Sequence, residues 1–138
     1  MKHLLTVLFI GLISFSVSAQ AKIVFKTDTI DYGTIDKGSN GVRVFEFTNT
    51  GDQPLIISKV NSSCGCTVPK KPEGPIQPGA TGEIEVKYDT NRVNPIRKTI
   101  TVISNAETPT VALKIKGEVI DPSKTSVLEK KNESVMQQ

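Results

Sequence analysis

Apolar and polar side chains alternate with a period of two along most of the chain. The pattern is clearest in residues 83–88, where Ile84, Val86 and Tyr88 are separated by charged residues, and it returns in residues 111–119. Side chains two positions apart in a strand point to the same face. Each segment therefore predicts a strand with one buried face and one solvated face.

Shorter runs of the same kind lie on both sides of these segments. They cover residues 23–25, 30–32, 45–47, 55–57 and 100–102. Clusters of Asn, Asp, Gly and Pro separate the runs, and no window shows a sustained period of 3.6 residues. About seven short strands between residues 22 and 120 predict an all-β fold, an antiparallel β-sandwich.

The N-terminal 19 residues have a different pattern. A short basic start, Met1-Lys2-His3, precedes a charge-free apolar run over residues 4–17, and small residues follow up to Ala19. The run is shorter than the roughly 20 residues that a membrane-spanning helix needs. These features predict a signal peptide over residues 1–19, a β-sandwich domain over 20–120, and export from the cell, with no membrane span after cleavage.

The last 18 residues, 121–138, are mostly polar. Asp121-Pro122 ends the final alternating run, and only a few large apolar residues follow. This composition predicts a flexible C-terminal tail, with a short helix or a docking segment as the alternative.

Composition narrows the chemistry that the mature protein can carry out. The single histidine, His3, lies in the leader, so cleavage leaves a chain without histidine. A Ser-His-Asp or Cys-His arrangement then cannot be built within one chain, and there is no phosphate-binding glycine loop. We therefore expect no enzyme activity and no cofactor.

Net charge argues against nucleic acid as a partner. The full chain has 17 basic and 14 acidic residues, a formal net charge of +3. Loss of Lys2 with the leader lowers the excess by one. Because such an excess gives no electrostatic footprint, we expect no nucleic-acid binding.

Cys64 and Cys66 are the only cysteines, separated by Gly65. In an extended strand their Cα atoms would lie about 6.6–6.8 Å apart, at the upper edge of the range for a disulfide. Gly65 would be the residue that lets the backbone contract. Three states remain open: a disulfide, a pair of free thiols, or a soft-metal site, for which Cu(I) is the natural ion. A structural pair is favoured over a redox dithiol, and both over a metal site, since neither histidine nor a methionine cluster completes a ligand shell.

The order of several motifs resembles one bacterial family. These motifs are Tyr32-Gly33-Thr34-Ile35, Phe45 through Gly51, Pro54-Leu55, Ser63-Cys64-Gly65-Cys66-Thr67 and Pro75 through Gly79. Together they resemble domain-of-unknown-function family 1573, over about residues 22–120. The resemblance implies an immunoglobulin-like β-sandwich of exported bacterial proteins, periplasmic or extracellular. It marks Cys64, Gly65, Cys66 and Thr67 as signature positions and assigns no catalytic residue.

Two functions follow as hypotheses. The first is an exported, non-enzymatic immunoglobulin-like module that binds a protein or an envelope component, with strand addition at a sheet edge as its mode of binding. The second is an extracytoplasmic thiol redox or Cu(I)-binding protein that uses Cys64 and Cys66. The partner and the oligomeric state are not encoded in any motif.

Overall fold

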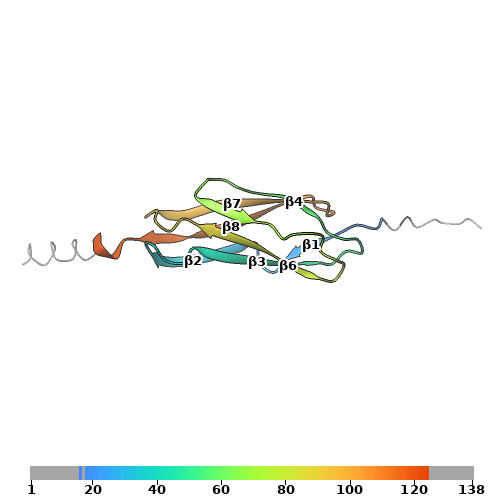
Figure 1. Ribbon diagram of the computed structural model, residues 1–138, viewed down its shortest axis with the longest axis horizontal. Helices are drawn as coiled ribbons and strands as arrows, with labels where there is room; N and C mark the ends of the chain where they lie inside the picture. The colour runs from blue at the N-terminus through green and yellow to red at the C-terminus, as the bar shows by residue number, and fades with distance from the viewer. Residues whose placement is uncertain (1–15, 17, 125–138) are drawn as a thin grey trace, which may run out of the picture.

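The computed structural model describes residue 16 and residues 18–124. Most of the predicted signal peptide and most of the predicted tail lie outside the described residues. Within them the chain forms eight strands in two four-stranded sheets, which confirms the predicted all-β sandwich (Figure 1). The strands are β1 (Ile23–Phe25), β2 (Thr29–Asp36), β3 (Val42–Asn49), β4 (Ile57–Ser62), β5 (Thr67–Lys70), β6 (Thr81–Tyr88), β7 (Pro95–Ser104) and β8 (Thr110–Ile120).

The two sheets have the orders β1-β3-β6-β5 and β2-β8-β7-β4. All pairings are antiparallel except one, because β2 runs parallel to β8. The predicted antiparallel β-sandwich therefore holds, with one parallel pair that the sequence did not indicate. The N-terminal segment pairs with β3 through β1, then crosses to the other sheet and continues along β8 as β2. The two short runs predicted at residues 23–25 and 30–32 are thus strands of different sheets.

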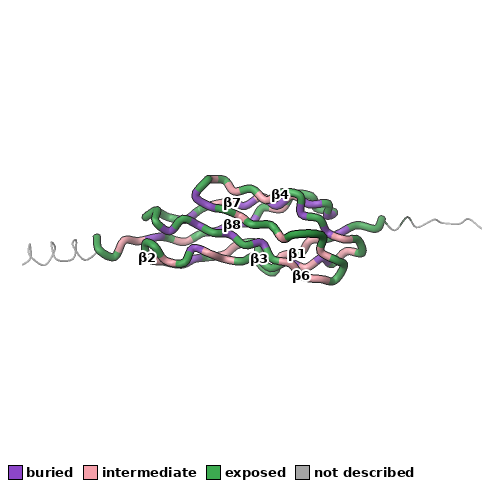
Figure 2. The backbone as a smooth tube through the Cα atoms, viewed as in Figure 1, coloured by how far each residue is buried: buried purple, intermediate pink, exposed green. Residues whose placement is uncertain are grey.

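The period-two pattern maps onto the two faces of the sheets as predicted. In β6, Ile84, Val86 and Tyr88 are buried, and the charged residues between them are exposed. Figure 2 shows the same alternation of buried and exposed positions along the strands. The side chains that are almost completely buried form one core between the sheets: Phe45, Phe47, Leu55, Ile84, Val86, Ile96, Ile100, Val102, Leu113, Ile115 and Val119.

Strand β5 was not predicted. It has only four residues, and one of them is Pro69, which lacks the N–H that a central strand needs. Proline is tolerated in β5 because this strand lies at the edge of its sheet, paired with β6 on one side only. Edge position is a property of the tertiary structure, so the local sequence could not indicate it.

Asn49, at the end of β3, is a fully buried polar side chain that joins three segments. Its Nδ2 group donates to the carbonyls of Gln53 (2.7 Å) and Ile76 (3.0 Å). Its Oδ1 accepts from the N–H groups of Lys22 (3.3 Å) and Gly51 (3.1 Å). Because every polar atom of the amide is used, the buried asparagine fixes the turn after β3 against both the N-terminal segment and the loop before β6.

Gly51 completes the same junction. A Cβ atom at this position would collide with the backbone of residues 20–22. Asn49 and Gly51, which belong to one of the turn-forming clusters in the sequence, therefore lie where two backbone segments are in close contact.

Tyr32, on β2, is a buried side chain whose hydroxyl is hydrogen-bonded inside the fold. Its hydroxyl donates to the Gly41 carbonyl (2.8 Å), and the Arg43 guanidinium lies 4.2 Å from the centre of its ring. Burial raises the pKa of the Tyr32 phenol, while the charge of Arg43 acts in the opposite direction. The ring of Tyr88 packs edge-on at 6.3 Å, so the cluster connects the two sheets.

Candidate functional site

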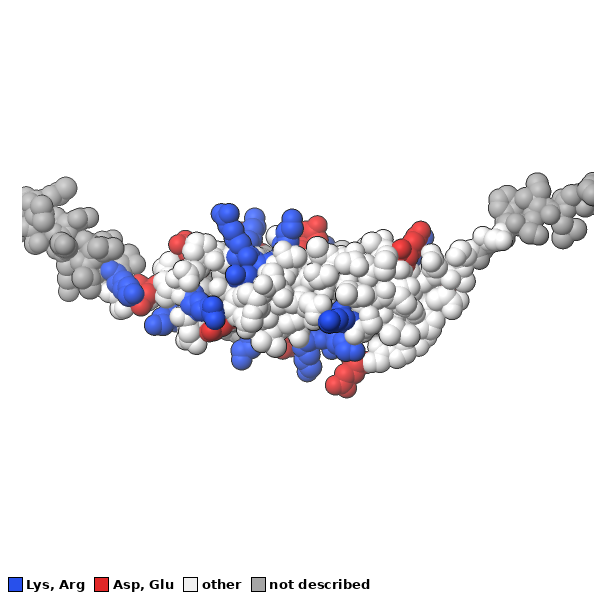
Figure 3. All heavy atoms as spheres, turned by 90° about the horizontal axis from the view of Figure 1, so that it is seen from above, with Lys and Arg blue, Asp and Glu red and all other residues white. Residues whose placement is uncertain are grey.

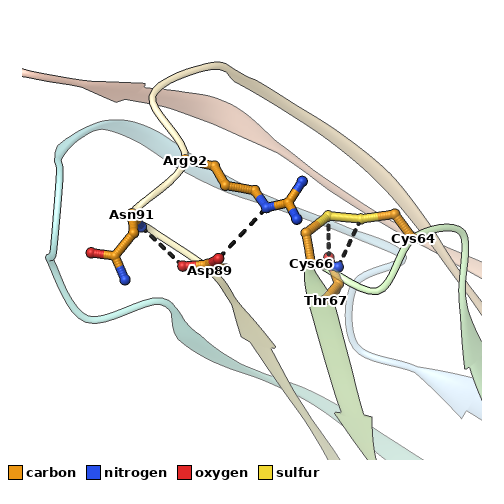
Figure 4. A network of polar contacts seen from close by, with 6 residues as sticks. All are labelled: Cys64, Cys66, Thr67, Asp89, Asn91 and Arg92. Carbon is orange, nitrogen blue, oxygen red and sulfur yellow. Dashed lines mark hydrogen bonds and ion pairs between the residues drawn. A yellow bond between two sulfur atoms is a disulfide. The ribbon is translucent and has the colours of Figure 1, made fainter.

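The cysteine pair lies where the chain crosses from one sheet to the other. Cys64 and Cys66 occupy the turn between β4 and β5, and a disulfide joins them (Figure 4). Their Cα atoms are 5.3 Å apart, well inside the usual range for a disulfide. The distance is shorter than in an extended strand because residues 63–66 form a turn.

Gly65 does not have the role that the sequence suggested. Its backbone is not in the left-handed region, and a Cβ atom at this position would meet nothing within 4 Å. The contraction between the cysteines therefore comes from an ordinary turn that other residues can adopt. The consequence of glycine here is open space beside the disulfide.

Backbone hydrogen bonds fix both ends of this turn. On the β4 side, Ser63 N–H donates to the Thr99 carbonyl (2.9 Å), and Thr99 N–H donates to Ser63 Oγ (3.1 Å). On the β5 side, Asp89 N–H donates to the Cys66 carbonyl (2.8 Å). None of these bonds uses a sulfur atom, so the turn is held in place independently of the disulfide.

The two sulfur atoms have unequal surroundings. Cys66 is only 5% exposed, whereas Cys64 is partly exposed. Cys66 N–H donates to Cys64 Sγ (3.1 Å), and the hydroxyl of Thr67 lies 3.8 Å from Cys66 Sγ. The signature residue Thr67 is buried against the less accessible sulfur.

An ion pair lies next to the disulfide. Arg92 Nε is 3.5 Å from Asp89 Oδ2, and Asp89 Oδ1 accepts from Asn91 N–H (3.1 Å). Figure 4 shows the Arg92 side chain extending toward the disulfide. The sequence identified residues 91–95 only as a loop, because nothing local links Arg92 to a cysteine pair 26 positions earlier.

The two cysteines of the soft-metal alternative are joined as a disulfide in this structure. Among residue 16 and residues 18–124, no group of three or more His, Cys, Asp and Glu side chains is placed to hold a metal ion. The thiolate is the form of cysteine that binds metal, and a disulfide has none to offer.

Beside the disulfide, β4 is the edge strand of the second sheet. It pairs with β7 through Lys59 opposite Ile103 and Asn61 opposite Thr101. Along an antiparallel strand, every second residue directs its N–H and C=O groups toward the neighbouring strand. Because Ser63 bonds Thr99 of β7, residues 59 and 61 direct their backbone groups toward β7 as well. The N–H and C=O groups of Val60 and Ser62 therefore point away from β7, along the open side of the sheet.

The neighbouring edge, β5, has the opposite character. The Asp89–Cys66 bond places Val68 and Lys70 in the ladder with β6, so the outward positions are Thr67 and Pro69. Thr67 N–H already donates to the Cys64 carbonyl (3.3 Å), and proline has no N–H. The outer side of β5 thus offers acceptors and no free donor.

The two remaining edges are less regular. β1 has three residues, and β2 has a register shift between Asp31 and Thr34, with Gly33 at a φ of 65°. Bulges of this kind protect sheet edges against pairing with other chains. β4 has a register shift of its own between Ile57 and Lys59, and its regular part, from Lys59 to Ser62, has outward donors and acceptors at Val60 and Ser62.

Charged residues are spread over the surface. Figure 3 looks down on the upper side of the molecule in Figure 1, where β4 lies, and shows Lys and Arg dispersed around an uncharged band with a few acidic residues between them. In the described residues no helix is long and apolar enough to cross a membrane.

A family model described as "Protein of unknown function (DUF1573)" matches residues 23–119. The chain belongs to the DUF1573 family. This confirms the resemblance that the sequence motifs indicated. No curated protein matches the chain.

Solved structures share the fold at low sequence identity. A protein of unknown function from Porphyromonas gingivalis W83 is 21% identical with a TM-score of 0.64, covering 72% of this chain and 48% of that one. The chain thus spans about half of that protein's length. The ASH/PapD-like domain 7 of human CEP192 is 10% identical with a TM-score of 0.62, covering 88% and 96%. The CupB2 chaperone of Pseudomonas aeruginosa is 7% identical with a TM-score of 0.51, covering 70% and 55%.

These likenesses show an immunoglobulin-like, PapD-like fold for the DUF1573 domain. At such identities they carry the fold alone, and none of them assigns a role to the Cys64–Cys66 turn.

Proposed function

We propose that this DUF1573 protein is an exported, non-enzymatic immunoglobulin-like module that binds a protein of the cell envelope by strand addition along β4. The observation that carries the proposal is the open edge of β4, regular from Lys59 to Ser62, beside the donor-free edge of β5. In strand addition, main-chain hydrogen bonds supply affinity and alternate side-chain contacts supply specificity.

The surroundings of β4 suit an extended polypeptide. Val60 and Ser62 provide two outward N–H and two outward C=O groups, and Val60 is partly exposed. Just before the strand, Ile56 is 52% exposed, and on the adjacent β5 Val68 is 63% exposed. A partner strand that pairs with β4 would place its side chains beside Val60 and Ile56, and apolar side chains would suit these neighbours.

The lack of donors on the outer edge of β5 determines which of the two neighbouring edges can pair with a partner strand. Of these two neighbouring edges, only β4 offers a partner strand both donors and acceptors, because β5 has no free N–H to donate. The fold likeness to the CupB2 chaperone, and to the YadV chaperone with a TM-score of 0.50, is compatible with a role in binding other proteins.

The experiment compares two proline variants of matched design. Val60→Pro removes an outward N–H of β4 without breaking a bond to β7. Thr34→Pro is the control on β2, because the bond from Lys37 N–H to the Ile120 carbonyl places Thr34 N–H on the outer side of that strand. Both variants are first shown to fold by circular dichroism.

Each protein is then crosslinked at native expression, and crosslinked partners are identified by mass spectrometry. We expect one partner that is captured by the wild type and Thr34→Pro and lost with Val60→Pro. In the purified complex, the amides of Val60 and Ser62 should gain protection from hydrogen exchange. Equal capture by all three proteins, or no partner at all, would overturn the proposal.

Export has a separate test. Intact mass of the protein recovered from the extracytoplasmic fraction should correspond to a chain that begins at Gln20, within two residues. A full-length chain retained in the cytoplasm would contradict this part of the proposal.

A further inference from the structure

We propose that the Cys64–Cys66 disulfide is a thiol-exchange site, attacked at Cys64, that accepts two electrons from a dithiol of an exported polypeptide. The inference goes beyond binding at β4 and does not rest on it. It arises from the unequal burial of the two sulfurs and from the hydrogen-bond donor next to each.

Burial determines which sulfur is attacked. An incoming thiolate must approach one sulfur along the S–S bond from the far side, which requires access to that atom. Cys64 is partly exposed, whereas Cys66 is only 5% exposed. Exchange therefore begins at Cys64, and Cys66 is the leaving thiolate.

Each sulfur has a donor that stabilises it as a thiolate. The Thr67 hydroxyl, 3.8 Å from Cys66 Sγ, can donate to the thiolate released first. Cys66 N–H, 3.1 Å from Cys64 Sγ, can donate to the thiolate released second. Hydrogen bonds to the charged form of a thiol stabilise the thiolate and so favour a good leaving group.

The fold tolerates the opening of this bond. The ring that the disulfide closes spans only three residues, so its contribution to the entropy of the unfolded chain is small. Both ends of the turn are held by bonds of Ser63 and of the Cys66 carbonyl that involve no sulfur. Reduction should therefore leave β4 and β5 in place and be reversible.

The reaction balances as follows. A thiolate of the dithiol bonds to Cys64 Sγ, the S–S bond breaks, and its electron pair leaves on Cys66 Sγ. The second thiol of the dithiol then attacks the dithiol's other sulfur, which is bonded to Cys64 Sγ in the mixed disulfide, and the Cys64 thiolate is released. The dithiol becomes a disulfide, losing two electrons and two protons, and Cys64 and Cys66 take these up as two thiols.

The first experiment uses the unaltered protein, so no variant has to fold. The native protein is mixed with an excess of a mass-tagged small monothiol, quenched with acid, and mapped by peptide mass spectrometry. We expect a mixed disulfide on Cys64, exceeding that on Cys66 by at least about tenfold, since even a modest opening free energy protects a buried sulfur by that factor. Equal labelling, labelling mainly at Cys66, or no labelling short of denaturation would overturn the proposal.

The second experiment measures electron transfer to a defined dithiol. A reduced synthetic peptide with two cysteines is incubated with the protein, and both masses are followed. The peptide should lose two hydrogens for each chain that gains two. Cys64→Ser/Cys66→Ser should show no transfer, and Val60→Pro should react at the wild-type rate even if it loses its binding partner. A peptide that stays reduced beside folded, oxidised protein would refute exchange.

Discussion

Asn49 provides the most direct test of how this fold is held together. Its side chain makes four hydrogen bonds to backbone groups, at 2.7, 3.0, 3.1 and 3.3 Å, and it is completely buried. Asn49→Ala removes all four and leaves four backbone groups without that partner. A typical net value of about 1 kcal/mol for each bond gives an expected loss of about 4 kcal/mol in the free energy of unfolding.

The assay is urea denaturation followed by far-ultraviolet circular dichroism, since the chain has no tryptophan. Asn105→Ala is the matched control. The Asn105 amide also bonds two backbone groups, Ile56 N–H (2.7 Å) and the Pro54 carbonyl (3.0 Å), but it is exposed, so water can replace it. We expect the midpoint of Asn49→Ala to fall far more than that of Asn105→Ala, with similar slopes. Losses of equal size would refute the reasoning from burial.

A second variant tests the directions of the bonds. Asn49→Asp keeps the acceptor toward Lys22 and Gly51 but, when ionised, faces the Gln53 and Ile76 carbonyls with no donor. The folded state should therefore favour the protonated side chain. The stability of this variant relative to wild type should recover as the pH falls toward the range where a carboxyl is protonated and decline as the pH rises. A difference independent of pH would contradict the assigned donors.

Three further predictions concern other positions. Tyr32→Phe should lose about 1 kcal/mol at neutral pH through its hydroxyl bond. Because burial raises the Tyr32 pKa, the stability that the neutral phenol gives is complete below about pH 10 and lost as the pH rises through the folded-state pKa. The gap between wild type and Tyr32→Phe should thus narrow above about pH 10 in denaturation series, and a constant gap would count against this. At Gly117, φ is 141° and a Cβ atom would collide with the β2 backbone, so Gly117→Ala should lose about 1–3 kcal/mol of unfolding free energy in the same assay. Gly65→Ala should change the unfolding free energy by no more than about 0.5 kcal/mol. Comparable losses in the two variants would contradict this difference between the two glycines. Cys64→Ser/Cys66→Ser should lose only about 1–2 kcal/mol, given the small ring, and unfolding of that variant at ambient temperature would contradict this.

The alternation of side chains was enough to predict the layered fold. In β6 and β8 every second residue is apolar, so each strand has one face that leaves water, and two such sheets must pack together. The pattern missed β5, an edge strand of only four residues with a proline, and it did not show that the runs at residues 23–25 and 30–32 belong to different sheets. Neither feature follows from local sequence, since both depend on which strand lies beside which.

The same division holds at the candidate site. The sequence identified Cys64 and Cys66 because they are the only cysteines and lie one residue apart. It could not show that Cys66 is buried and Cys64 partly exposed, nor that Asp89 binds the Cys66 carbonyl. These properties come from the crossing between sheets, which brings residues from β4, β5 and the loop after β6 together.

By itself, the sequence determined the chemistry available to this protein: strands with one apolar face, a DUF1573 motif order, and a single pair of reactive side chains. Only the tertiary structure decided which edge is open, which sulfur is exposed, and why Asn49 and Gly51 stand where they do. The physical reason is that periodicity is encoded between neighbours along the chain. Edges, burial of a particular atom and close backbone contacts depend instead on segments tens of residues apart that meet only when the two sheets pack.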